Sequence, residues 1–91
     1  MIEFTGEVEV FPQQGGWHYV AAPSWVVAEL DEAPDRGLYA VEATVGASTW
    51  PTSLMPKGDG SHFLALSAAV RRTNSIELGD EVTVSIVPRI R

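Results

Sequence analysis

The stretch AVRRTNSIELGDEVTV, residues 69–84, decides how the rest of the chain is read. It places two arginines side by side, then a Gly-Asp pair, and then a run in which apolar and polar residues alternate. Gly-Asp favours a tight corner, and period-two alternation is typical of a half-buried strand. The stretch therefore predicts a helix of about two turns, a corner and a strand.

The same alternation recurs along the chain and predicts a mostly β protein. In the opening segment Ile2, Phe4, Val8 and Val10 fall on one face, and acidic or hydroxyl residues fall on the other. Val82, Val84 and Ile86 repeat the pattern near the end. The expected strands are residues 2–10, WHYVAA at 17–22, 38–45, TWPTSL at 49–54, HFLAL at 62–66 and 82–86.

Prolines and glycines mark where these strands turn. Pro12 with the Gly15-Gly16 pair predicts a hairpin between the first two strands. Pro51 lies inside a strand and therefore predicts an edge position or a bulge. KGDG, residues 57–60, has the glycines of a phosphate loop but not its Gly-Lys-Ser/Thr ending, so it predicts a turn.

Two short helices interrupt the strands. Ser24 is the expected cap of the first, which must stop before Pro34 and carries the acids Glu29, Asp31 and Glu32 in its last turn. Ser67 is the expected cap of the second. Six strands and two stubby helices predict a small β-barrel that occupies residues 1–91 as one domain.

Composition limits the classes of protein that fit. The chain has 91 residues, 45% of them apolar, which suffices for one core. It has no cysteine, so disulfides and thiolate metal sites are unavailable, as is usual in a reducing cytoplasm. No basic leader and no apolar run of membrane-spanning length is present. We expect a soluble, cytoplasmic protein with no membrane partner.

The charge argues against nucleic acid as a partner. The net charge is −6, with eight acids and only Arg36 in residues 1–42, so the few remaining cations lie in the second half. A duplex binder needs several cationic contacts to phosphate, and an acidic chain starts at a disadvantage.

Arg71 and Arg72 leave two interpretations open. Neighbouring helical residues point about 100° apart, so only one of them can lie over the body of the protein. In one interpretation the pair stabilises the carbonyls at the helix end, by roughly 0.3–1 kcal/mol. In the other, Arg71 uses its planar fork to hold an anionic group, a carboxylate or a phosphate.

Several of these elements also carry a resemblance. A strand, a short helix with Val-Arg-Arg, Gly-Asp and a strand resemble the half-barrel unit of AbrB/MazE-type proteins. More of the chain resembles a small bacterial family of unknown function with a related double-split β-barrel, sometimes fused to a YdeI/OmpD-associated bacteriocin-protection domain. The matching elements are GGWHYV with Pro23, VGASTWPTSLMP, Asp59-Gly60, AAVRR and GDEVTV.

The resemblance implies a double-split barrel and little about activity. AbrB-type proteins bind DNA as intertwined dimers, although a shared fold does not transfer a function. The family's lysine before the helix is replaced here by Ser67 or Ala68, which removes one cation of an anion site. Its leucine-glycine after the helix is Asn74-Ser75, and Asn74 can adopt the left-handed conformation that closes a helix.

The chain offers little for catalysis. His18 and His62 are its only histidines, neither lies in a recognisable motif, and G-x-S-x-G is absent. Their spacing does not suggest a metal site. We therefore expect no enzymatic activity, no metal and no cofactor.

Three tryptophans, Trp17, Trp25 and Trp50, are many for this length. They either plug the barrel and its ends, or Trp17 and Trp50 line a pocket mouth with His18 and Arg71.

The leading hypothesis is a non-enzymatic binding module for a small molecule or a protein partner. The alternative is an AbrB-like DNA-binding dimer that uses the cations of the second half. The Pro51 edge also suggests a homodimer.

Overall fold

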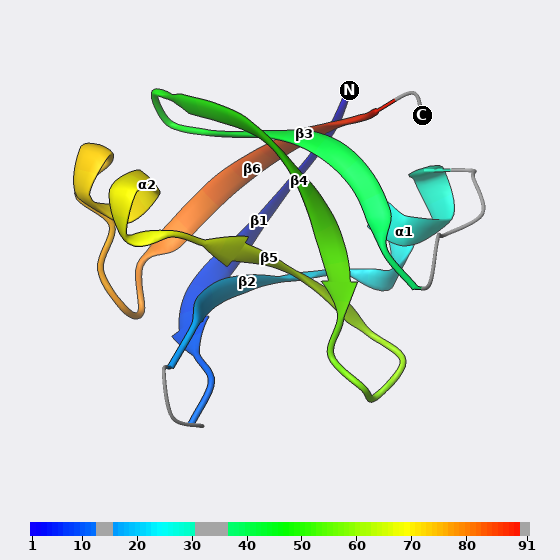
Figure 1. Cartoon of the computed structure of the whole chain (residues 1–91), viewed down its shortest axis with the longest axis horizontal. Helices are drawn as coiled ribbons and strands as arrows, with labels where there is room; N and C mark the ends of the chain where they lie inside the picture. The colour runs from blue at the N-terminus through cyan, green and yellow to red at the C-terminus, as the bar shows by residue number, and fades with distance from the viewer. Residues whose placement is uncertain (13–15, 31–36, 90–91) are drawn as a thin grey trace.

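The computed structural model describes residues 1–12, 16–30 and 37–89, in which six antiparallel strands close into a barrel (Figure 1). The strands follow one another in the order β1-β2-β5-β4-β3-β6, and β6 pairs back onto β1. The predicted mostly β barrel of about six strands with two short helices is confirmed. The elements are β1 (Ile2–Val10), β2 (His18–Ala22), α1 (Ser24–Leu30), β3 (Tyr39–Val45), β4 (Ser48–Pro56), β5 (His62–Leu66), α2 (Ala68–Thr73) and β6 (Glu81–Pro88).

Some predicted features lie outside the described residues. These are Gly15 of the first turn, Asp31 and Glu32 of the last turn expected for the first helix, Pro34 beyond it, and the last two residues of the basic tail. No helix in the described part of the chain has the length and apolar character needed to cross a membrane.

The β1–β2 hairpin has the predicted arrangement. Val8 lies opposite Val20, and Phe4 and Val8 are buried while the acidic residues of β1 are exposed. Val10, predicted to face inward, is instead 37% exposed. It pairs with His18, the first residue of β2, so it lies where the paired part of the hairpin ends.

Every strand and both helices contribute side chains to one apolar core. Val84 and Ile86 of β6 have no exposed surface, as the alternation predicted, and Val82 is half-buried against the cluster. Burying a side chain of this size stabilises a fold by about 1.5–3 kcal/mol. None of the described residues is a buried polar or charged one, so the hydrophobic effect accounts for this interior.

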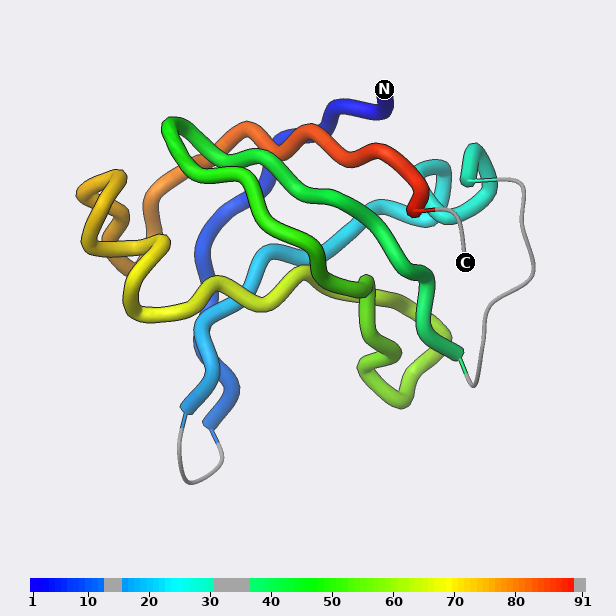
Figure 2. Tube along the Cα trace, turned by 45° about the horizontal axis from the view of Figure 1, so that its top comes forward, coloured from blue at the N-terminus to red at the C-terminus, as the bar shows by residue number. Residues whose placement is uncertain are grey.

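The barrel wall is incompletely paired between β4 and β5. β4 pairs with β3 from Ser48 to Leu54, but with β5 only at Met55 and Pro56. Residues 48–54 therefore form an edge on the side that faces β5. Pro51, which has no N–H, lies within this edge, so its predicted edge position is confirmed. Figures 1 and 2 both show β4 following β3 and diverging from β5.

The two helices lie at opposite ends of the barrel (Figure 1). α1 has Ser24, the residue predicted as its cap, as its first helical residue, and it buries Val26 and Leu30. α2 begins after Ser67, whose hydroxyl accepts a hydrogen bond from the Val70 amide (3.2 Å) and forms the predicted cap.

The end of α2 differs from the prediction. Asn74 has φ −108°, and Ser75, with φ 54°, takes the left-handed conformation instead. The Asn74 side chain ties α2 to the turn between β3 and β4. Its Oδ1 accepts from the Ala47 amide (2.8 Å), and its Nδ2 donates to the Ser48 hydroxyl (3.0 Å) and the Val70 carbonyl (2.9 Å). Asn74 is still the C-cap of α2, but the left-handed residue that closes the helix is the one after it, Ser75.

The Gly-Asp pair forms the corner that leads into β6. Gly79 has φ 91°, and the Asp80 carboxylate accepts a hydrogen bond from the Glu77 amide (2.8 Å). The Gly79 amide donates to the Val8 carbonyl (2.9 Å), and the Val8 amide donates to the Asp80 carbonyl (2.8 Å). The corner is therefore anchored to β1 and sets the register in which β6 closes the barrel.

Candidate functional site

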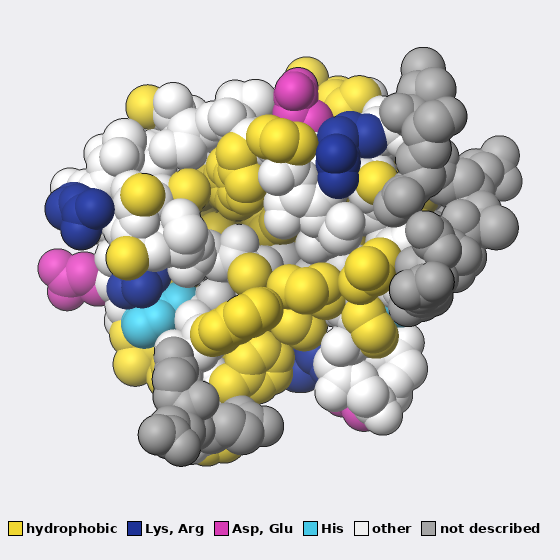
Figure 3. All heavy atoms as spheres, viewed as in Figure 1, with side chains coloured by type: hydrophobic (Ala, Val, Ile, Leu, Met, Phe, Trp, Pro, Cys, Tyr) yellow, Lys and Arg dark blue, Asp and Glu magenta, His cyan; other side chains and the backbone are white. Residues whose placement is uncertain are grey.

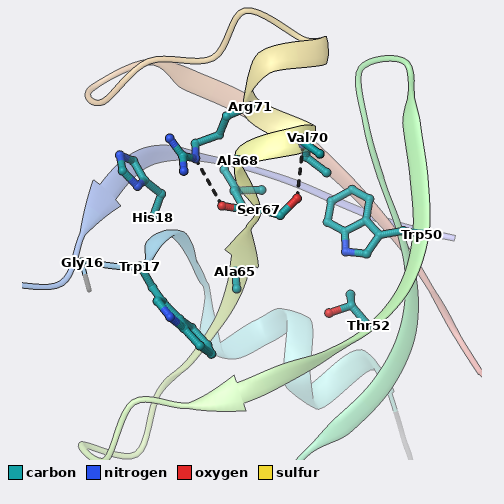
Figure 4. Close-up of a pocket in the computed structure, with 12 residues that line it drawn as sticks. Gly16, Trp17, His18, Trp50, Thr52, Ala65, Ser67, Ala68, Val70 and Arg71 are labelled. Carbon is teal, nitrogen blue, oxygen red and sulfur yellow. Dashed lines mark hydrogen bonds between the residues drawn. The ribbon is translucent and has the colours of Figure 1, made fainter. Parts of the chain in front are cut away.

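A pocket of about 680 Å³ lies where β4 diverges from β5, beside α2 (Figure 4). Its walls come from residues 16–18 at the start of β2, from Trp50 and Thr52 on the edge of β4, and from residues 65–71. Small-molecule sites typically enclose roughly 300–1,000 Å³. In Figure 3 hydrophobic side chains border a hollow on this face, with His and Lys or Arg side chains toward α2.

All four residues that the sequence predicted as a ligand site line this pocket. Trp17 and His18 come from the first hairpin, Trp50 from β4, and Arg71 from α2. The barrel thus brings three distant segments to one place, because β2 and β5 pair while α2 follows β5 directly. That these residues bind a ligand stays a prediction.

Arg71 and Arg72 separate as the helical geometry predicted. Arg71 is half-buried and its Nε donates to the Leu66 carbonyl (3.3 Å), whereas Arg72 is exposed. The carbonyls of the last helical turn accept hydrogen bonds from the backbone amides that follow α2. The Arg71 side chain is therefore directed back toward β5 and the pocket instead of capping the helix end.

His18 lies beside the Arg71 guanidinium because both groups are positioned by Leu66. In the β2–β5 ladder His18 is the partner of Leu66, whose carbonyl holds Arg71. Figure 4 shows the imidazole and the guanidinium on the same side of the pocket. This end of the pocket is polar and carries a cation.

The tryptophans do not plug the barrel ends. Trp17 is 57% exposed and Trp25 is 47% exposed, so that expectation is wrong for both. Trp50 is half-buried and packs against the core. In Figure 4 Trp17 and Trp50 lie on opposite sides of the pocket, with Ala65 and Ser67 between them. Trp25 belongs to α1 at the other end of the barrel.

The two histidines do not form a joint site. His18 lies at one end of the β2–β5 ladder and His62 at the other, about 13 Å apart along the strands. His62 donates from Nε2 to the Gly37 carbonyl (3.2 Å) and packs edge-on against Tyr39. Among the described residues no three His, Asp or Glu side chains are grouped so that they could hold a metal ion.

A second pocket of about 540 Å³ lies at the His62 end, bordered by the turn between β4 and β5. In this turn the Ser61 hydroxyl and the Ser61 amide both donate to the Asp59 carboxylate. These two hydrogen bonds, the hydroxyl's first, lower the pKa of Asp59. The serine and the carboxylate are thus engaged with each other and stabilise the turn.

The cations that a DNA-binding surface would use are spread over the described residues. Lys57 lies over the ring of Tyr19, 5.2 Å from its centroid. Arg89 donates to the carbonyls of Val41 (3.0 Å) and Thr52 (2.8 Å). Figure 3 shows Lys and Arg side chains at separate places on the face drawn. DNA binding stays a prediction that these positions do not favour.

Sequence reasoning missed the residues that make room for the pocket. Ala65, Ala68 and Ala69 leave space where larger side chains would fill it, and Thr52 lines the opposite wall. The run of small residues around Ser67 was a usable signal. The divergence of β4 from β5 was not visible, because it depends on pairing between distant segments.

Comparison with known proteins identifies the family to which this chain belongs. No curated protein matches the chain. The family described as a domain of unknown function (DUF1905) matches residues 4–86, a span that runs from the first core residue of β1 to the last of β6. The chain therefore belongs to the DUF1905 family, and its six-stranded barrel is the structure of this domain.

Proposed function

We propose that this domain is a non-enzymatic binding module that takes a small molecule in the pocket between β4, β5 and α2. The observation that carries the proposal is the convergence of Trp17, His18, Trp50 and Arg71 on one pocket of about 680 Å³. Aromatic walls with a few convergent polar groups are the usual composition of ligand sites. A protein partner is the other occupant that the exposed Trp17 would suit.

The chemistry of the lining supports binding over catalysis. The Ser67 hydroxyl accepts a hydrogen bond from the Val70 amide, where it serves to cap α2. Arg71 is fixed to the Leu66 carbonyl. These groups hold the pocket in shape, which favours recognition.

The AbrB resemblance suggests a different function, DNA binding by a homodimer. A net charge of −6 and cations at separate places on the face drawn in Figure 3 support pocket binding over phosphate binding. The relation to AbrB-type double-split barrels and to YdeI/OmpD-associated fusions stays a prediction from the sequence.

The three indole N–H groups provide a direct test. Isotope-labelled protein is titrated with small aromatic and aliphatic fragments of positive, negative and neutral charge, up to roughly 1 mM, where binding of about −4 kcal/mol is still detected. We expect the N–H signals of Trp17 and Trp50 to shift together. Trp25, on α1, is the internal control and should stay in place.

A filled pocket provides the matched variant. Ala65→Leu adds volume between the two tryptophans and should weaken binding at least about tenfold, whereas Ala28→Leu, on the exposed surface of α1, should not. If no fragment of any charge shifts Trp17 or Trp50, or if Ala65→Leu binds as tightly as the native chain, the proposal is wrong.

A further inference from the structure

The charge of the pocket is opposite to the charge of the chain. Arg71 lines the pocket, and among the described residues that border it, 16–18, 50, 52 and 65–71, none is an aspartate or a glutamate. The pocket lining is thus more positive than the chain as a whole, whose net charge is −6. A cation in a mostly apolar lining, with no carboxylate beside it, attracts an anionic group more strongly than it would in open water.

The way in which Arg71 is held determines what it can still bind. Its Nε donates to the Leu66 carbonyl, the one hydrogen bond that its side chain forms within the described residues. The two terminal nitrogens remain available as a pair. Two parallel N–H groups match the two oxygens of a carboxylate. Arg89 differs, because its Nε and Nη2 both donate to backbone carbonyls.

The rest of the pocket suits a flat apolar group. Trp17 and Trp50 lie on opposite sides, and Figure 4 shows Ala65 between them and Arg71 with His18 at one end. Trp17 leaves 57% of its surface exposed, a large apolar area that a ring system could cover. Aromatic side chains make stacked or edge-on contacts with other flat rings, so they favour planar ligands.

We propose that the pocket binds a monocarboxylate with a flat, apolar body. The carboxylate pairs with the terminal nitrogens of Arg71, beside His18, and the body lies between Trp17 and Trp50. One guanidinium balances one negative charge. A phosphate monoester carries about two, so one would remain unpaired in an apolar pocket. This inference rests on the proposed function and adds the class of ligand to it.

Three probes with one ring system test the ligand class. Naphthoate, naphthamide and naphthyl phosphate are titrated into the native chain, and dissociation constants are read from the Trp17 and Trp50 N–H signals. A hydrogen bond to a charged group is worth more than one to a neutral group, so naphthoate should bind about tenfold more tightly than naphthamide. Naphthyl phosphate should bind more weakly than naphthoate.

Two neighbouring arginines give a matched pair of variants. Arg71→Gln keeps a donor that can reach the Leu66 carbonyl but removes the charge, so naphthoate binding should fall to the level of naphthamide. Arg72→Gln makes the same change of charge one residue away, outside the pocket, and should leave all three constants unchanged. If Arg71→Gln does not fold, the comparison of the three probes on the native chain still decides the question.

The failures of the two proposals are distinguishable. Equal binding of naphthoate and naphthamide, or tighter binding of naphthyl phosphate, overturns the monocarboxylate and leaves a binding pocket of another specificity. Unchanged naphthoate binding by Arg71→Gln also overturns it. Absence of any signal change with all three probes and with the fragment set overturns the binding function itself.

Discussion

Asn74 shows how one side chain can join parts of the barrel that the backbone leaves apart. Its amide connects the end of α2 to the turn between β3 and β4 through Ala47 and Ser48. Gly46 makes this approach possible, since it has φ 57° and a Cβ there would overlap Asn74 Oδ1. The side chain therefore fixes α2, and with it Arg71, against the rest of the barrel.

Gly46→Ala should be destabilising for two separable reasons. The left-handed conformation costs an L-residue about 1–2 kcal/mol, and the clash with Asn74 adds to that cost. Gly58→Ala is the control, because Gly58 also has positive φ (97°) but has nothing within 4 Å of an added Cβ. Urea unfolding of Gly46→Ala, Asn74→Ala and the double variant measures the clash. We expect the double variant to lose less than the sum of the single losses; strict additivity would contradict the described geometry.

Asp59 should titrate below its usual range because Ser61 stabilises its charged form. Ser61→Ala should raise the pKa of Asp59 toward that of an unperturbed aspartate, as followed by NMR of the carboxyl carbon. Ser53→Ala, on β4, should not change it.

The direction of the pH effect follows from the same bonds. Since folding lowers the pKa of Asp59, the ionised carboxylate stabilises the fold above the unfolded-state pKa. That contribution is lost as the pH falls through the folded-state pKa. An Asp59 pKa that is unaffected by Ser61→Ala would mean that the two residues do not interact in solution.

At the scale of elements, the sequence predicted most of what local patterns can encode. Alternation located the strands, and Ser67 located the start of α2. The exposure of Trp17 and the bonds of Asn74 could not be predicted, because both depend on segments that lie far away in the sequence. The four site residues were predicted together for their chemistry, while the alanines that open the pocket gave only the weaker signal of a run of small residues around Ser67.

Substitution of Ser67 tests how much the cap stabilises α2, a helix of only six residues. Ser67→Ala should lower the free energy of unfolding by about 1 kcal/mol. Ser67→Asp keeps an oxygen that can accept from the Val70 amide and should be nearly neutral. Equal losses for the two variants in urea unfolding would show that the hydroxyl does not act as a cap.

At the scale of the molecule, one chain closes its own barrel. β6 pairs with both β1 and β3, and the core draws on every strand. An intertwined dimer of the AbrB type would need strands from a second chain to complete its fold. The homodimer suggested by the Pro51 edge stays a prediction, and it would join barrels that are already folded.

This distinction can be measured by unfolding at different protein concentrations. Because one chain supplies all six strands of the barrel, we expect the thermal midpoint to be the same across roughly a hundredfold range of concentration. A midpoint that rises with concentration would indicate that folding and association are coupled, as in an intertwined dimer. Analytical ultracentrifugation of the folded protein reports separately whether intact barrels pair.

The short ladder between β4 and β5 has one more consequence. Only Met55 and Pro56 of β4 pair across this seam, so widening it breaks few backbone hydrogen bonds. We therefore expect the β4–β5 pairing to open more readily than the other five strand pairings, which would give a ligand of the proposed pocket a route of entry and exit. A ligand that contacts both Trp50 and Ala65 would hold β4 and β5 together. Slower amide exchange at Met55 and Phe63 on addition of the ligand would indicate this stabilisation.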